Sequence, residues 1–329
     1  MRYRLMGQSG LRVSDLFLGT MNFGDDDTAV SAADARKLLD TYAEAGGNVL
    51  DTANVYPGDG ASERILGDWL GHDRDRFVVA TKYSLSLDAS DPNAAGNHRK
   101  SLVRSLEHSL NSLKTDYIDL LWVHLWDPNT PIEETMRALD DVVRAGKVLY
   151  VGISDAPGWV VSRANAIAEL RGWTPFVGLQ VPYSLVRRDI ERDLLPMADA
   201  LGLSVATWAS LGRGLLSGRH TRGKPAGRTR VDSATISARH RQIAREVDAV
   251  ADHLGITSSQ VALAWTMTRS SRVHPIVGAS RLDQLTDDLA APDVTLPDEA
   301  LGRLDRASAI DLGFPLDFIG GAFPPFHEP

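Results

Sequence analysis

Residues 48–67 read NVLDTANVYPGDGASERILG, and they contain one repeat of the pattern that decides the fold. An apolar, β-branched run ends at Asp51, a polar loop follows, and Ser62–Leu70 then carries apolar residues at helical spacing. Just before this stretch, Gly46 and Gly47 supply the left-handed cap that ends a preceding helical segment. A strand that follows one helix and leads into another is the repeating unit of a parallel sheet with helical crossovers.

The same unit recurs along the chain in both directions. Strands are predicted at Leu16–Gly19, Asn48–Asp51, Phe77–Thr81, Ile118–His124, Leu149–Ile153, Val177–Val181, Ser204–Trp208 and Pro275–Val277. Helical segments between them include Ala32–Ala45, Ser62–Leu70, Arg99–Leu113, Pro131–Ala145 and Asp189–Leu201. About eight strand–helix repeats favour a closed (β/α)₈ barrel over an open sheet. The length of 329 residues would also suit two domains, but no linker or composition break divides the chain, so a single domain is predicted over residues 1–329.

Three segments fall outside the alternation. Arg2–Ser14 is predicted to form a hairpin that turns at Gln8-Ser9-Gly10. Gly218–Arg230 is a loop rich in Gly, Arg and Lys, and an extra helix is predicted at Ala238–Leu254. Asp311–Pro329 is an aromatic, Pro-rich tail.

Composition narrows the classes of function. The formal net charge of -8 argues against nucleic-acid or anionic-membrane binding, because both need a basic surface. Cysteine is absent, which excludes disulfides, thiolate nucleophiles and zinc–cysteine sites. Met1–Thr20 has no long apolar run, and no stretch approaches the roughly 20 apolar residues of a membrane span, so a cytoplasmic protein is expected.

Polar side chains cluster at neighbouring strand ends, where active sites of this fold lie. Asp51 ends one strand and Tyr56 lies in the loop after it, while Lys82 and His124 end the next two strands. Each has a structural alternative: Asp51 as a helix cap, Tyr56 as a loop aromatic, Lys82 as a solvated strand end, and His124 as a hydrogen-bonded structural histidine. Their convergence on one barrel mouth favours a functional interpretation.

These four residue types suit the reduction of a carbonyl. A carbonyl that accepts hydride becomes an alkoxide and needs a proton, but a free phenol has a pKa near 10. An ammonium group roughly 4 Å away interacts by about 4 kcal/mol at an effective dielectric of 20, which equals about three pKa units as an upper bound. Lys82 is therefore predicted to bring the pKa of Tyr56 toward neutrality. Asp51 would hold Lys82, and His124 would position the carbonyl oxygen.

Further motifs follow in order along the chain: RYRLMGQSGLRVSDLFLGTMNFG at 2–24, VATK at 79–82, LWVH at 121–124, YVGIS at 150–154, WASLGRGLLSG at 208–218 and PIVGASRLDQL at 275–285. Together with the stretch at 48–67, they resemble the aldo-keto reductase superfamily over nearly the whole chain. The likeness is to a longer-chain branch that is related to bacterial aldo/keto reductases and potassium-channel β subunits. The resemblance implies a (β/α)₈ barrel, NADPH as cofactor, and a catalytic tetrad of Asp51, Tyr56, Lys82 and His124.

The resemblance also implies a cofactor site across the remaining strand ends. Its residues would be Thr20, Met21, Ser154, Asp155, Gln180, Trp208, Ala209, Ser210, Leu211, Gly212, Arg213, Gly214, Arg219, Gly278, Ser280, Arg281, Gln284, Asp287 and Asp288. Ser154, Asp155 and Gln180 would bind the nicotinamide amide, and Trp208 would stack on the ring unless it is a core tryptophan. Many relatives carry Asn in place of Asp155, and a carboxylate accepts a hydrogen bond but cannot donate one.

The phosphates would lie on two glycine-containing turns. Gly212 and Gly214 let the backbone approach the pyrophosphate closely, while Lys224, Arg228 and Arg230 either fold over it or are simply solvated. The start of the helix after the last strand is a good anion site, because free N–H groups and the helix dipole point at the ligand. Ser280 and Arg281 there would hold the 2′-phosphate, which predicts NADPH over NADH. Gln284 and Asp288 would approach the adenine, although Asn is common at the second position.

The substrate walls are predicted to be apolar: Met21, Phe23, Tyr83, Trp126 and the C-terminal tail. Ordinary loop packing is the alternative for each. The expected partner is a small carbonyl compound of unidentified structure.

Two other classes of function remain as alternatives. A cofactor-binding regulatory subunit with little turnover would keep the same tetrad, as potassium-channel β subunits can, so only turnover separates the two. A metal-dependent barrel hydrolase is disfavoured because the sequence lacks HExxH, and GISDA at 152–156 lacks the second glycine of GxSxG. No metal is predicted.

Overall fold

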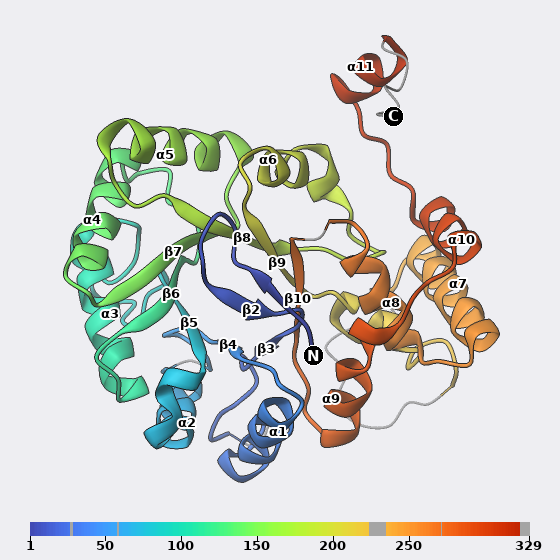
Figure 1. The fold of residues 1–329 in the computed structure, drawn as a ribbon, viewed down its shortest axis with the longest axis horizontal. Helices are drawn as coiled ribbons and strands as arrows, with labels where there is room; N and C mark the ends of the chain where they lie inside the picture. The colour runs from blue at the N-terminus through green and yellow to red at the C-terminus, as the bar shows by residue number, and fades with distance from the viewer. Residues whose placement is uncertain (27–28, 58, 224–234, 271, 323–329) are drawn as a thin grey trace.

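The computed structural model describes residues 1–26, 29–57, 59–223, 235–270 and 272–322. Eight parallel strands form a closed barrel in which each strand pairs with its neighbours in chain order and the last pairs with the first. The strands are β3 (Phe17–Gly19), β4 (Val49–Asp51), β5 (Val78–Tyr83), β6 (Ile118–Val123), β7 (Val148–Ser154), β8 (Phe176–Pro182), β9 (Ser204–Trp208) and β10 (Val273–Val277). The predicted (β/α)₈ barrel is confirmed (Figure 1).

Helices surround the barrel on the outside. They are α1 (Ala32–Glu44), α2 (Ala61–Leu70), α3 (Arg99–Leu113), α4 (Ile132–Arg144), α5 (Gly158–Arg171), α6 (Leu194–Ala200), α7 (Ala238–Leu254), α8 (Ser258–Met267), α9 (Leu282–Leu289) and α10 (Asp298–Ser308). The predicted bounds of α3 and α7 agree with the structure. Sequence periodicity did not single out α5 and α8. The apolar residues of α8 are spread around its circumference, and the buried residues of α5 are mostly small.

The single helix predicted at Asp189–Leu201 is wrong. The chain forms a 3-10 helix at Asp189–Arg192, breaks at Asp193 and restarts as α6. Pro196 explains the break, because its ring lacks an N–H and would clash with the carbonyl four residues earlier. When the helix starts at Leu194, this proline falls in the first turn, where it is tolerated.

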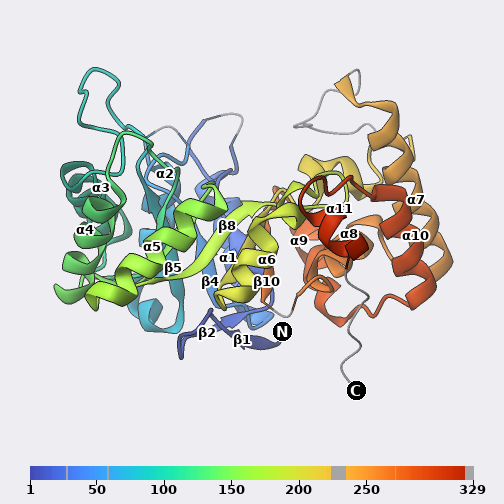
Figure 2. The same cartoon turned by 90° about the horizontal axis from the view of Figure 1, so that it is seen from above.

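The predicted hairpin is present and closes one end of the barrel. It pairs β1 (Tyr3–Leu5) with β2 (Arg12–Ser14). The side chains of Met6 and Val13 are fully buried and pack with Phe17 and Trp122 of the barrel interior. Figure 2 shows the hairpin at one end and the long loops after the strands at the other. The carboxyl ends of the strands, at the opposite end from the hairpin, open onto a cavity.

The predicted tail does not fold over that opening. Arg192 donates from Nε and Nη2 to the carbonyl oxygen of Asp311 at 3.0 and 2.8 Å, which directs the chain along the outside. The short helix α11 (Leu316–Ala322) then stands away from the barrel (Figure 1), and the Phe314 side chain is 86% exposed. The assignment of the C-terminal tail to the substrate wall is therefore wrong for residues 311–322, and residues 323–329 lie outside the described part of the chain.

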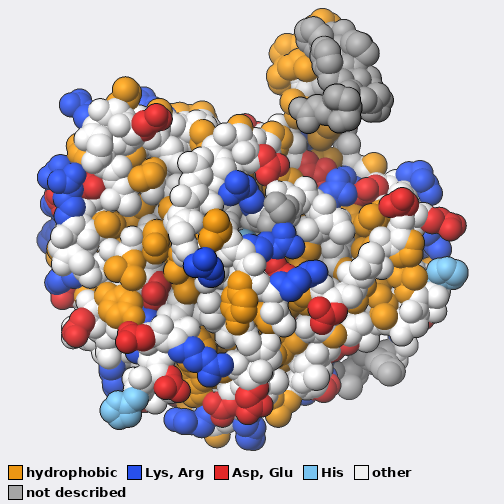
Figure 3. Space-filling view, viewed as in Figure 1, with side chains coloured by type: hydrophobic (Ala, Val, Ile, Leu, Met, Phe, Trp, Pro, Cys, Tyr) orange, Lys and Arg blue, Asp and Glu red, His pale blue; other side chains and the backbone are white. Residues whose placement is uncertain are grey.

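The surface at the hairpin end mixes acidic, basic and apolar side chains (Figure 3). Arg2 and Arg4 both pair there with the buried carboxylate of Asp15, at 2.8 and 2.5 Å. Within the described residues, no helix has both the length and the apolar character that crossing a membrane requires.

Candidate active site

A cavity of about 500 Å³ opens at the carboxyl ends of the strands. Most of the residues that line it end a strand or lie within a few residues beyond one, so the barrel brings together positions from all parts of the sequence. They are Gly19, Met21, Asn22, Asp51, Tyr56, Leu85, His124, Ser154, Asp155, Gln180, Trp208, Ala209, Arg213, Ile276 and Gly278. Three of the four predicted catalytic residues are among them, and the fourth, Lys82, lies directly behind.

A buried ion pair forms the back of the cavity. The Lys82 ammonium contacts a carboxylate oxygen of Asp51 and donates to the Thr52 carbonyl at 2.7 Å. The other Asp51 oxygen accepts from Gln180 Nε2 at 2.7 Å. Burial lowers the pKa of Lys82, but the charge of the paired Asp51 carboxylate raises it, and the net direction is upward. Lys82 therefore stays charged and fixed in orientation.

Tyr56 and His124 face each other in front of this pair. The phenol oxygen lies 3.4 Å from His124 Nε2, and the two rings meet edge to face. The Lys82 ammonium is 4.9 Å from the centre of the Tyr56 ring. Burial, with Lys82 acting in the same direction, lowers the pKa of His124 to about 3, so the imidazole is neutral.

The predicted direction of the Tyr56 pKa shift, downward under the influence of Lys82, is wrong. Burial raises the pKa of its phenol, and Lys82 only partly opposes this. The prediction counted the nearby ammonium but not the desolvation of the phenolate, which a sequence does not show. The phenol is therefore protonated at neutral pH.

A second wall of the cavity comes from the ends of β7, β8 and β9. Trp208 donates from its indole nitrogen to Asp155 Oδ1 at 3.3 Å. Asp155 has a φ of +46°, a conformation that Asp and Asn adopt more readily than most residues. Burial raises its pKa, with the Trp208 hydrogen bond acting against this. Among the described residues, Ser154 Oγ is buried and has no hydrogen-bond partner.

The backbone after β9 folds into an open turn. A 3-10 helix spans Gly212–Ser217, and Gly212, Arg213 and Gly214 all have positive φ. A side chain at Gly214 would meet nothing within 4 Å, so the space beside this backbone is free. Leu211 packs against the core, Ser210 bonds to Thr207, and Arg219 is half-buried just beyond the turn. Lys224, Arg228 and Arg230 lie outside the described residues.

The helix start after β10 is exposed and polar. Ser280 donates from its backbone nitrogen to Gln284 Oε1 at 3.2 Å, and Arg281 pairs with Asp283 at 2.8 Å. Asp288 is buried, and this burial raises its pKa to about 8. Asp287 accepts hydrogen bonds from Thr257 and Gln260 at 2.8 Å each, so its carboxylate already joins α9 to the start of α8.

Several predicted residues do not line the cavity. Thr20 is fully buried, and its hydroxyl bonds to Ser62 and to the Asp51 carbonyl. Phe23 and Tyr83 have no exposed surface and belong to the core between barrel and helices, so their assignment to the substrate wall is wrong. Trp126 lies two residues beyond His124, where it packs edge-on against Trp159 at 5.7 Å.

Five residues of the site were not predicted. Gly19, Asn22, Leu85 and Ile276 line the cavity, and their position just after or within a strand end was the available signal. Glu63 is fully buried behind the site and accepts from the Thr81 hydroxyl at 2.6 Å. Its burial raises the pKa to about 7. A glutamate in an amphipathic helix is ordinarily solvated, so the burial of Glu63 could not be predicted from the residue pattern.

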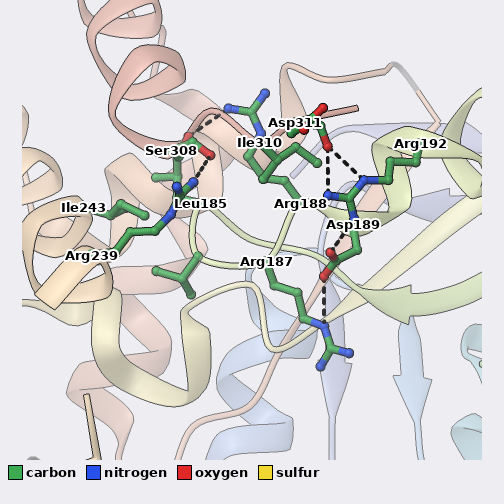
Figure 4. A pocket seen from close by; sticks show the side chains of 11 residues that line it. Leu185, Arg187, Arg188, Asp189, Arg192, Arg239, Ile243, Ser308, Ile310 and Asp311 are labelled. Carbon is green, nitrogen blue, oxygen red and sulfur yellow. Dashed lines mark hydrogen bonds and ion pairs between the residues drawn. The ribbon is translucent and has the colours of Figure 1, made fainter. Parts of the chain in front are cut away.

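A smaller pocket of about 240 Å³ lies between the loop after β8 and the C-terminal segment (Figure 4). Its arginines are already bound. Arg188 pairs with Glu191 at 2.8 Å, Arg192 pairs with Asp189 at 2.9 Å, and Arg239 donates to the carbonyl oxygen of Ser308 at 3.3 Å. These contacts give it a structural role rather than a catalytic one.

A model of the aldo/keto reductase family matches residues 15–309. The chain belongs to the aldo/keto reductase family. It is 38% identical over 326 residues to a norsolorinic acid reductase of Aspergillus flavus, with 96% of this chain and 83% of that protein covered. A norsolorinic acid reductase of Emericella nidulans is 40% identical, with coverages of 94% and 82%. An aryl-alcohol dehydrogenase of Pestalotiopsis microspora is 37% identical, with coverages of 97% and 85%.

Family membership makes this chain an oxidoreductase of the carbonyl-reducing kind, and such enzymes use NAD(P)H. The residues present fit such a cofactor. The buried Ser154 hydroxyl still needs a partner, and the backbone at Gly214 and Gly278 leaves room for a ligand to approach.

Proposed function

We propose that this chain is an NADPH-dependent reductase that converts an aldehyde or ketone into an alcohol, with Tyr56 as the proton donor. The observation that carries the proposal is the pairing of the Tyr56 hydroxyl with His124 Nε2, 3.4 Å apart, in front of the buried Lys82–Asp51 pair. A carbonyl oxygen bound beside both groups meets two hydrogen-bond donors. Both bonds strengthen as negative charge develops on that oxygen.

Tyr56 carries the proton that the alkoxide needs. Its raised pKa keeps the phenol protonated at neutral pH, so Tyr56 already carries the proton that it donates when the reaction begins. The phenolate left behind is stabilised by the Lys82 ammonium, which Asp51 and the Thr52 carbonyl hold in place. Lys82 therefore acts on the product side of the proton transfer.

His124 orients the carbonyl as a neutral donor. With a pKa of about 3 the ring carries one hydrogen, and the role requires that hydrogen on Nε2, which faces Tyr56. A neutral imidazole orients the carbonyl oxygen without placing a second positive charge beside Lys82. His124 thus positions the substrate and leaves the proton to Tyr56.

Bound NADPH would supply the hydride. Ser154, Asp155 and Gln180 would hold its carboxamide, with Gln180 using Oε1 because its Nε2 is bound to Asp51. Arg213, Arg219, Ser280 and Arg281 would hold the phosphates. The Arg281–Asp283 pair is exposed, and such pairs contribute about 1 kcal/mol or less, so Arg281 is free to exchange Asp283 for a 2′-phosphate.

The substrate is proposed to carry an aryl group next to its carbonyl. Met21, Leu85 and Ile276 give the cavity apolar walls. Apolar walls of this kind suit an aryl group, because burying its apolar surface is favourable. The relative named as an aryl-alcohol dehydrogenase supports this choice.

The test is NADPH oxidation across a panel of aryl aldehydes, aryl ketones, aliphatic aldehydes and sugars. Wild type should turn over the aryl compounds, and Tyr56→Phe should lose at least about a hundredfold in kcat, as expected for a general acid. Unchanged NADPH affinity in Tyr56→Phe is the control for folding. Near wild-type turnover in this variant would refute the assignment.

Two further outcomes separate the alternatives. NADPH binding without oxidation by any reactive aldehyde would favour a regulatory subunit. Equal catalytic efficiency with NADH would count against the 2′-phosphate site at Ser280 and Arg281.

A further inference from the structure

The Asp155 carboxylate is a half-buried negative charge without a short ionic partner among the described residues. Its side chain lines the cavity, and Oδ1 accepts from the neutral indole of Trp208 at 3.3 Å. An indole N–H stabilises a carboxylate but does not cancel its charge. Part of the field of Asp155 therefore reaches into the cavity.

The other charges close to the back of the cavity are balanced. Lys82 is paired with Asp51, and His124 is neutral. Arg187 lowers the pKa of Asp155 from a distance. Its side chain is 56% exposed and lies 3.8 Å from Asp189, so the Asp189 carboxylate and the solvent both weaken its attraction to Asp155. Asp155 thus sets the net charge of this part of the cavity.

The proposed chemistry fixes where a hydride donor must lie. Hydride passes directly to the carbonyl carbon, whose oxygen sits between Tyr56 and His124. The donor ring must then lie against the facing wall, which Ser154, Asp155, Gln180 and Trp208 form. This step rests on the proposed function.

We infer that Asp155 makes this site discriminate between the oxidation states of the cofactor and favour the oxidised form. The nicotinamide ring is positively charged when oxidised and neutral when reduced, whereas the charges on the phosphates stay the same. Arg281 lies outside the cavity lining and acts nearly equally on both forms, whereas a charge that lines the cavity distinguishes them. Arg213 also lines the cavity and opposes Asp155, but it is unchanged in Asp155 variants, which therefore isolate the contribution of Asp155. A carboxylate there attracts the oxidised ring.

The expected size is measurable. At a separation of roughly 6 Å and an effective dielectric of about 40, the attraction corresponds to about a tenfold difference in binding. For a two-electron couple, a tenfold preference lowers the midpoint potential of the bound cofactor by about 30 mV. Asp155 would thereby make the bound reduced cofactor a stronger hydride donor toward the carbonyl.

Asp155→Asn is a nearly isosteric test. Asn suits a φ of +46° at least as well as Asp does, and its Oδ1 can still accept from the Trp208 indole. Dissociation constants for NADP⁺ and NADPH are measured by titration calorimetry at pH 8, and again for NAD⁺ and NADH. The ratio of the NADP⁺ constant to the NADPH constant should rise about tenfold in the variant, with the larger change in NADP⁺.

A matched control removes a buried carboxylate elsewhere. Asp15→Asn also neutralises an aspartate, which is ionised at pH 8 because Arg2 and Arg4 hold its pKa below the ordinary value, but at the hairpin end of the barrel, and it should change both constants by the same factor. Asp155→Gly, which also suits positive φ, serves as the second uncharged variant if Asp155→Asn does not fold.

The outcomes separate the two proposals. Wild type that binds neither cofactor pair overturns the proposed function. Wild type that binds, together with an unchanged ratio in Asp155→Asn or Asp155→Gly, overturns the inference and leaves the proposed function standing. An equal rise of the ratio in Asp15→Asn would also overturn it, because charge alone, not position, would then be responsible.

Discussion

At the residue scale, Glu63 carries a prediction about pH and stability. Its pKa is about 7 in the folded protein against 4.5 for an ordinary glutamate, so the folded state binds more protons between those values. The free energy of unfolding therefore falls as pH rises from 4.5 through 7, by on the order of 3 kcal/mol. Glu63→Gln should remove this loss, so the stability of the variant relative to wild type should be greater at pH 8 than at pH 5.

Urea unfolding at the two pH values checks this expectation. Glu169→Gln, on an exposed position of α5, is the control and should show the same pH dependence as wild type. Parallel curves for wild type and Glu63→Gln would show that Glu63 does not titrate in this range.

The residue types of the site were easier to predict from the sequence than their surroundings. The types and positions of Asp51, Lys82 and His124 were sufficient to predict their convergence, because parallel strands end at one mouth. The direction of the Tyr56 pKa shift was not predictable, since desolvation by the surrounding loops determines it. Phe23 and Tyr83 were assigned wrongly for a related reason: aromatic residues beside a strand end fill the core as readily as they line a cavity.

At the element scale, periodicity and caps predicted most strands and the longer amphipathic helices. Capped elements such as α3 agreed with their predicted bounds, whereas the segment containing Pro196 broke because its proline has to occupy a first turn. Helices α5 and α8 have no single apolar stripe, and so the helical period is weak in their sequence.

The hairpin carries a prediction at this scale, because it plugs the barrel end opposite the cavity. Met6 is fully buried among barrel side chains, and Met6→Ala should lower the free energy of unfolding by about 2–5 kcal/mol. NADPH affinity should stay within twofold of wild type. Leu5→Ala is the matched control, since Leu5 is 51% exposed and its truncation should cost well under 1 kcal/mol.

Urea unfolding and calorimetric titration give the two readouts. A large loss of NADPH affinity in Met6→Ala without a loss of stability would contradict the separation of the two barrel ends.

At the scale of the whole molecule, the closed barrel was predictable from the number of repeats, but the path of the C-terminal segment was not. Its course depends on contacts with residues more than a hundred positions earlier, such as Arg188 to Ser308 and Arg192 to Asp311. No local pattern encodes such pairs. That the chain folds as one domain over residues 1–329 stays a prediction.

Arg188 is the centre of that attachment, and its removal should loosen the C-terminal segment. The guanidinium is largely buried, binds Glu191 through two nitrogens at 2.8 and 2.9 Å, and donates to Ser308 Oγ at 2.8 Å. Arg188→Leu would leave the Glu191 carboxylate buried without its cation, which typically costs about 3–5 kcal/mol. Because the pair is shielded from solvent, the loss should persist at 0.5 M salt.

Arg187→Leu is the matched comparison. Arg187 is 56% exposed and pairs with the exposed Asp189 at 3.8 Å, so its loss should cost about 1 kcal/mol or less in urea unfolding, an amount that shrinks with salt. Limited proteolysis should cleave Arg188→Leu beyond Ser308 faster than either wild type or Arg187→Leu. Equal stability and equal cleavage of the two variants would show that burial of the pair does not determine how the C-terminal segment is held.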